Sequence, residues 1–238
     1  MDIVPGVLLE RARTSLRLRA LDARDRARGD ADPLLPPRRL RGRAGDSDFV
    51  ATGRRLAAVV RALGAVGPSS RVLDVGCGSG RLARELVGLL RPPGAYVGFD
   101  VDGESVAWCR RAYARRLQAT FVHADLANGF YAPGGSAAAA GYAFPVADGW
   151  ADCVVATSVF THLLDADAAR YLDESRRVLA PGGRIVASFL LADGGGGDEA
   201  RRLTDPGALA RDLSARGLRE VARTELPGGQ TALAVAHA

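Results

Sequence analysis

The chain has 238 residues, of which 47% are hydrophobic and 25% are charged, and its formal net charge is +5 at pH 7. This length suits one α/β domain with a single buried core and leaves little room for a second full domain. All 32 basic residues are arginine, so reactions that need a lysine, such as Schiff-base formation or phosphate binding by a P-loop, are excluded.

The excess of positive charge lies in the N-terminal segment. Residues 1–43 contain 11 arginines against 6 acidic residues, and the rest of the chain is formally neutral. Binding to nucleic acid is therefore not expected, because such proteins normally carry basic residues across the binding domain itself. The sequence also has no apolar run long enough for a membrane span and no signal-peptide pattern, which predicts a cytoplasmic location without membrane attachment.

Residues 1–44 are predicted to form an arginine-rich arm that precedes a domain of residues 45–238. Within the arm, residues 7–28 favour a helix, because Ala, Leu and Arg dominate and no Gly or Pro interrupts them. A proline-rich linker that includes the basic residues 38–43 should follow. Three interpretations of the arm stay open: a solvated extension, a lid over the active site, and a contact surface in a homodimer.

The domain should begin with a helix over residues 47–63, which Ser47 or Asp48 could cap. Residues 71–83 then read RVLDVGCGSGRLA, an apolar strand that breaks into three alternating glycines and resumes as a helix. Glycines permit a sharp turn and a close approach of the backbone to a ligand, and helix N-terminal N–H groups point at that ligand. The stretch therefore predicts a cofactor loop. NAD is a weak candidate, because the dinucleotide fingerprint needs glycine where Arg81 stands.

Strands and helices alternate along the rest of the chain. Strands are expected at 96–100, 120–125, 152–159, 184–191, 218–226 and 230–237, and helices at 79–90, 103–117, 165–179 and 205–216. This alternation is typical of a parallel sheet with helices on both faces, and the Pro-Gly-Gly turn at 227–229 indicates a hairpin. The predicted fold class is α/β, a doubly wound and mostly parallel seven-stranded sheet with a C-terminal antiparallel hairpin.

The sequence VLDVGCGSG, followed by YVGFD at 96–100, resembles the first two motifs of class I S-adenosylmethionine-dependent methyltransferases of the bacterial small-molecule type. The resemblance covers residues 45–238. It implies S-adenosyl-L-methionine as cofactor and methyl transfer to an oxygen or nitrogen of a small molecule, in bacterial secondary metabolism. The cofactor-binding residues that it implies are Asp74, Gly76, Cys77, Gly78, Gly80, Asp100, Val101, Asp125, Leu126 and Thr157.

Carboxylates are expected at two strand ends, where doubly wound sheets bind their ligands. By the resemblance, Asp100 accepts the two ribose hydroxyls and Asp125 accepts the adenine amino group. Asp74 and the glycines would hold the methionine part of the cofactor. A structural role, in which Asp100 and Asp125 only cap the following helices, stays open.

His162 is the candidate catalytic residue. It lies just past the strand at 152–159, and a neutral imidazole near pH 7 suits a general base that removes a proton from the acceptor. The alternative is a structural histidine that fixes the loop or touches the cofactor.

Aromatic residues gather in the segment 128–150, which could form one wall of a small-molecule pocket. The candidate substrate-binding residues are Phe130, Tyr131, Tyr142, Phe160 and His162. Phe144 and Trp150 are expected instead to fix the segment onto the sheet.

The three cysteines, Cys77, Cys109 and Cys153, show neither paired spacing nor a histidine cluster, so reduced thiols and no metal site are expected. Two alternative functions stay open. The same fold could host a non-methylating reaction, such as cyclisation or aminopropyl transfer, or the chain could be a non-catalytic protein that binds a partner through the basic arm.

Overall fold

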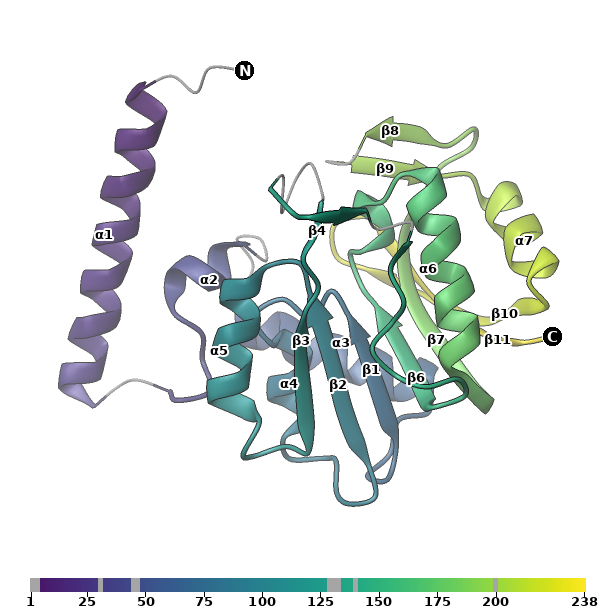
Figure 1. Ribbon diagram of the computed structural model, residues 1–238, viewed down its shortest axis with the longest axis horizontal. Coiled ribbons are helices and arrows are strands. Elements are labelled where there is room, and N and C mark those ends of the chain that lie inside the picture. The colour runs from purple at the N-terminus through teal and green to yellow at the C-terminus, as the bar shows by residue number, and fades with distance from the viewer. Residues whose placement is uncertain (1–4, 30–31, 44–47, 128–133, 139–140, 199–200) are drawn as a thin grey trace.

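A single β-sheet forms the centre of the molecule, with helices on both of its faces (Figure 1). The computed structural model describes residues 5–29, 32–43, 48–127, 134–138, 141–198 and 201–238. Seven strands follow the order β10-β11-β7-β6-β1-β2-β3. Their bounds are β1 Arg71–Val75, β2 Ala95–Asp100, β3 Ala119–His123, β6 Ala151–Ala156, β7 Leu179–Leu191, β10 Leu218–Leu226 and β11 Gln230–His237.

The directions of the strands confirm the predicted fold class. The strands from β3 to β7 in this order pair in parallel, whereas β11 runs antiparallel to both β7 and β10. The strand order reverses beside β1, because β2 and β3 lie on one side of it and β6 and β7 on the other. In such sheets this reversal creates a crevice at the carboxyl ends of the strands.

Successive residues of each strand face opposite layers of helices. Val72 of β1 packs in one apolar cluster with α3, α4 and α5, while Leu73 packs in another with α6 and α7. The bounds of these helices are α3 Phe49–Gly64, α4 Arg81–Leu86, α5 Gly103–Tyr113, α6 Asp165–Val178 and α7 Pro206–Ala215. Because helices cover both faces, the central strands β1 and β6 are buried along almost their whole length.

Local sequence signals set the ends of several helices. Asp48 caps α3, as predicted, because its side chain accepts hydrogen bonds from two N–H groups of the first turn. Ser47, the other candidate cap, lies outside the described residues. Asp205 caps α7 by accepting a hydrogen bond of 2.7 Å from the Ala208 N–H.

Two boundaries near the glycine loop differ from the prediction. Helix α4 ends at Leu86, before the predicted end at residue 90. Gly88 lies between these two positions and lowers the helix propensity there. Strand β3 ends at His123, so Asp125 follows the strand instead of closing it.

The segment around β7 contains more strand than predicted. Strand β7 begins at Leu179, and a register shift against β6 accommodates Pro181, Gly182 and Gly183 as a bulge. After β7, where no strand was predicted before residue 205, β8 Gly196–Asp198 and β9 Arg201–Thr204 pair with each other, and β9 also pairs with the end of β7. A separate parallel pair, β4 Leu126–Ala127 and β5 Ala137–Ala138, follows β3.

The N-terminal arm consists of α1 Pro5–Arg28 and α2 Arg38–Arg43, so the prediction of a linker at 38–43 was wrong. Helix α1 stands apart from the sheet, whereas α2 lies beside α5 (Figure 1). Arg38 joins the two helices through ion pairs with Asp22 and Asp25, at 2.8 and 2.6 Å. Among the described residues, no helix is both long and apolar enough to cross a membrane.

Candidate active site

A cavity of about 570 Å³ opens at the carboxyl ends of β1, β2 and β6, where the strand order reverses. Both the position and the volume are typical of ligand sites in doubly wound proteins. Nine of the predicted site residues line it: Asp74, Gly76, Cys77, Gly78, Asp100, Val101, Leu126, Thr157 and His162.

The glycines of the loop have different surroundings although all three have positive φ angles. A Cβ added at Gly78 would meet nothing within 4 Å, so this part of the loop is open to the cavity. A Cβ added at Gly80 would lie 2.4 Å from Cε2 of Tyr113, a buried ring. Gly80, predicted to bind the cofactor, is therefore a packing position outside the cavity wall, while Gly78 leaves room for a ligand.

Asp100 lies at the end of β2 beside the glycine loop. Its Oδ2 accepts the Gly78 N–H at 2.7 Å, and its Oδ1 accepts the Asp102 N–H at 2.8 Å. Burial raises the pKa of Asp100, although these hydrogen bonds act in the opposite direction. Each carboxylate oxygen keeps a lone pair for a further donor, so the side chain can accept two ligand hydroxyls.

Asp74 is a buried carboxyl group at the end of β1, with 3% of its surface exposed. The hydroxyl of Tyr96 donates a hydrogen bond to its Oδ2. Burial nevertheless raises the pKa of Asp74 to about 7. A cationic ligand group beside Asp74 would favour the charged form and lower that pKa.

Two cysteines meet under the loop. The hydrogen bond with Cys109, together with burial, raises the pKa of the Cys77 thiol well above its usual range. Cys77 is therefore a neutral thiol at pH 7 and a poor nucleophile. The described residues contain no cluster of side chains that could hold a metal ion.

His162 reaches the cavity from a short 3-10 helix, η2 Phe160–His162, which follows β6. The His162 N–H donates to the Val159 carbonyl at 2.9 Å, which fixes the turn. The Phe160 ring stacks on Phe189 with centroids 4.9 Å apart. Phe160, predicted to bind substrate, is thus a core residue outside the cavity wall.

Two residues of the aromatic segment 128–150 contact a residue of the cavity wall. Tyr142 and Phe144 pack against Phe99 with centroid distances of 5.4 and 4.9 Å, and Phe99 itself lines the cavity. Phe144 is buried in the core, which confirms its predicted packing role. Tyr142 does not line the cavity, and the predicted substrate-binding residues Phe130 and Tyr131 lie outside the described residues.

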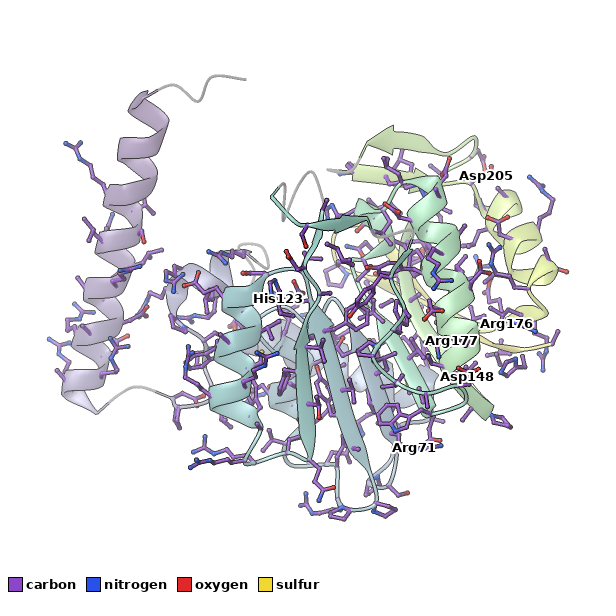
Figure 2. The ribbon with its side chains drawn as sticks, in the orientation of Figure 1. Arg71, His123, Asp148, Arg176, Arg177 and Asp205 are labelled. Carbon is purple, nitrogen blue, oxygen red and sulfur yellow. The ribbon has the colours of Figure 1, made fainter. Side chains whose placement is uncertain are left out.

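Asp125, the candidate for the adenine amino group, is exposed and does not line the cavity. Its Oδ2 accepts the Ser136 hydroxyl at 2.6 Å. The next residues, Leu126 and Ala127, do line the cavity. Two residues before Asp125, His123 contacts the Val101 carbonyl through Nε2 at 3.2 Å. Figure 2 labels His123 beside α5.

Several residues of the cavity wall were not identified from the sequence. Among them are Leu40, Gly42 and Arg43 of α2, Leu56, Ser79, Arg81, Ser158, Val159, Tyr171 and Gln230. Ser79 lies within the glycine stretch, and its Oγ is a buried atom with no hydrogen-bond partner among the described residues. A buried hydroxyl of this kind is normally satisfied, so Ser79 fits a ligand that supplies the missing partner.

Comparison with known proteins relates the middle of the chain to a family. Residues 72–183 match the family model described as a methyltransferase domain. The O-methyltransferase cnsE of Penicillium expansum is 30% identical over 122 residues, which are 51% of this chain and 38% of that protein. The chain spans less than half the length of the curated relatives that it matches.

Solved structures share the fold at lower identity. A 1,6-didemethyltoxoflavin-N1-methyltransferase from Burkholderia thailandensis was solved with bound 1,6-didemethyltoxoflavin and S-adenosylhomocysteine. It has a TM-score of 0.59 at 18% identity, and the match covers 100% of this chain and 91% of that chain. The [4+2]-cyclase SpnF has a TM-score of 0.57 at 23% identity, with coverage of 78% and 64%. Residues 72–183 thus match a methyltransferase domain, and the chain shares the fold of these solved structures.

Proposed function

We propose that the chain binds S-adenosylmethionine in this cavity and transfers its methyl group to an oxygen or nitrogen of a small molecule. The observation that carries the proposal is the joint position of Asp100 and Gly78. A carboxylate and an open stretch of glycine backbone face one cavity at the point where the strand order reverses.

Three residues of the cavity wall would each bind a different part of the cofactor. Asp100 would accept the ribose hydroxyls, and Asp74 would pair with the ammonium group of the methionine part. Ser79 would donate its hydroxyl to the ligand, because that oxygen has no other partner among the described residues. When bound, S-adenosylmethionine supplies an electrophilic methyl group on a sulfonium. The protein mainly aligns the acceptor with that group, a contribution of up to about 7 to 11 kcal/mol in well-oriented reactions.

His162 is proposed as the general base for an acceptor that must lose a proton. Its position on the wall, next to the turn that follows β6, supports this role. His162→Ala should lower turnover by about a hundredfold and leave binding of S-adenosylhomocysteine unchanged. Full turnover in the variant would assign His162 a structural role instead.

The decisive experiment is titration calorimetry with S-adenosylmethionine and S-adenosylhomocysteine. Micromolar binding by the wild type, about −8 kcal/mol, should be lost in Asp100→Ala. A screen with labelled methyl groups then identifies acceptors, and formation of S-adenosylhomocysteine separates methyl transfer from a cyclisation such as the one named for SpnF. A folded protein that binds neither compound would contradict the proposal.

We further infer that the second half of the arm covers the cofactor site. Leu40, Gly42 and Arg43 of α2 line the cavity, and Leu40 is 2% exposed. Arg43 forms ion pairs of 2.6 Å with Asp102 and 2.9 Å with Glu104, both next to the ribose candidate Asp100. These contacts favour the interpretation that the arm is a lid. They argue against the interpretation that it is a solvated extension. A homodimer through α1 is the remaining alternative, which the oligomeric state of an arm-deleted variant would test.

A further inference from the structure

Three polar side chains meet at the edge of the cavity although they come from separate parts of the chain. Ser158 follows β6, Ser188 belongs to β7, and Gln230 is the first residue of β11. These strands are neighbours in the sheet, and the antiparallel direction of β11 brings its first residue to the carboxyl ends of β6 and β7. Ser158 and Gln230 line the cavity, whereas Ser188 is completely buried.

The hydrogen bonds of this group fix the orientation of the Gln230 amide. The buried Ser188 hydroxyl donates to Oε1 of Gln230 at 2.6 Å, and it accepts the Ser158 N–H at 2.8 Å. Nε2 of Gln230 then donates to Oγ of Ser158 at 3.1 Å. The acceptor oxygen of the amide is thus turned to the protein interior, and its donor nitrogen lies on the side of Ser158.

The groups left for a ligand are both donors. An amide nitrogen carries two hydrogens, and among the described residues Nε2 of Gln230 has a single partner, Oγ of Ser158. The Ser158 hydroxyl donates only over 3.3 Å, to the Oε1 atom that already accepts the shorter bond from Ser188. A ligand oxygen would therefore offer both hydrogens a better acceptor than the protein does.

The backbone at this point is held in an uncommon conformation. Ser158 has a φ of 55°, in the left-handed region that residues other than glycine rarely adopt. The hydrogen bond from its N–H to Ser188 holds this conformation. Backbone conformations of this kind cluster at ligand-binding positions, where the surrounding structure enforces them.

We propose that Gln230 and Ser158 form a two-donor subsite for a carbonyl oxygen of the methyl acceptor, with Ser188 as the positioning residue. The inference rests on the proposed function, because it assigns the class of small molecule that the same cavity accepts. Apolar residues of the wall, among them Phe99 and Leu163, would contact the carbon skeleton of that molecule.

The test uses two isosteric probes on the full chain saturated with S-adenosylhomocysteine: a para-fluorinated acetophenone and the matching α-methylstyrene, in which a methylene group replaces the carbonyl oxygen. Fluorine NMR titration of the wild type should give about tenfold tighter binding of the ketone. Gln230→Glu keeps the oxygen that accepts the Ser188 bond but replaces the donor nitrogen, and it should remove the preference. Gln230→Met, which has neither group and leaves the Ser158 hydroxyl as the remaining donor, should lower the preference.

Thermal melting and calorimetry with S-adenosylhomocysteine accompany each variant and should match the wild type. Equal binding of the two probes by the wild type, or a preference that persists in Gln230→Glu, would overturn the inference. Weaker binding of S-adenosylhomocysteine in both variants would overturn it too, since the donors would then serve the carboxylate of the cofactor. If the wild type binds no S-adenosylhomocysteine, the proposed function itself is contradicted. This outcome distinguishes a failure of the proposed function from a failure of the subsite inference.

Discussion

Gly78 and Gly80 share left-handed backbone conformations, with φ angles of 52° and 85°, but differ in what surrounds them. Gly80→Ala would push a Cβ into the Tyr113 ring, which is fully buried and cannot move aside. We expect it to lower the free energy of unfolding by about 3 kcal/mol, measured by urea denaturation. Gly78→Ala meets only open space, so it should cost about 1 kcal/mol but weaken binding of S-adenosylhomocysteine. The reverse pattern would show that Gly80 contacts the ligand.

Asp74 predicts a pH dependence of stability in the ligand-free protein. Its pKa rises from the model-peptide value of 3.8 to about 7 on folding, because burial disfavours the carboxylate. The folded state therefore retains a proton that the unfolded state releases, and this contribution to stability is lost as pH rises from about 4 to 7. Asp74→Asn removes the titration and should gain on the order of 2 to 4 kcal/mol relative to wild type between pH 4 and 8. Urea denaturation across this range checks it; parallel pH profiles would contradict the prediction.

At the scale of elements, Glu174 and Arg177 of α6 bind the segment that carries Tyr142 and Phe144 through a hydrogen bond and an ion pair. Glu174 is 3% exposed and accepts the Phe144 N–H at 2.7 Å, while Arg177 binds Glu174 at 2.6 Å and Asp148 at 2.6 Å. Figure 2 labels Arg177 and Asp148 near the carboxyl end of α6. Burial acts to raise the pKa of Glu174, but the bonds from Arg177 and Phe144 outweigh it and lower the pKa below its usual range.

Arg177→Ala should therefore destabilise the protein by about 3 kcal/mol, because it leaves the Glu174 carboxylate buried with a weaker set of partners. The neighbouring Arg176 is exposed, so Arg176→Ala is the matched control and should change stability by less than about 0.5 kcal/mol. Hydrogen exchange should also increase at residues 142–148 in Arg177→Ala alone. Equal effects of the two substitutions would sink the assignment.

At the scale of the whole molecule, the arm is held on the body by arginine ion pairs whose side chains are partly exposed. Each such pair contributes less than about 1 kcal/mol and weakens as salt screens it. Arg43→Ala should weaken binding of S-adenosylhomocysteine about threefold and flatten its dependence on NaCl concentration, both measured by calorimetry. Arg54, exposed on α3, provides the control substitution to Ala. Identical affinity and salt dependence in Arg43→Ala and the wild type would remove the arm from the cofactor site.

The sequence by itself determined the fold class of the sheet and the position of the glycine loop at residues 71–83. Alternating apolar strands and helices predicted the fold class, and β10 and β11 were predicted to the residue, because a Pro-Gly-Gly turn marks the hairpin. Asp74, Gly76, Gly78 and Asp100, named from the glycine loop and the family resemblance, all line the cavity, and their binding roles stay predictions. The cytoplasmic location, the homodimer and the place in secondary metabolism stay predictions.

Only the tertiary structure decided which side chains complete the cavity. Gln230 had no sequence signal, because its position beside Ser158 depends on the order of β6, β7 and β11 in the sheet. Arg43 was predicted to lie in a linker, and its place on the cavity wall depends on ion pairs with residues about sixty positions away in the chain. Gly80 and Phe160 carried the right signals for a site but face the core instead. Local patterns report how a backbone turns, whereas contacts between distant segments depend on packing that no single stretch encodes.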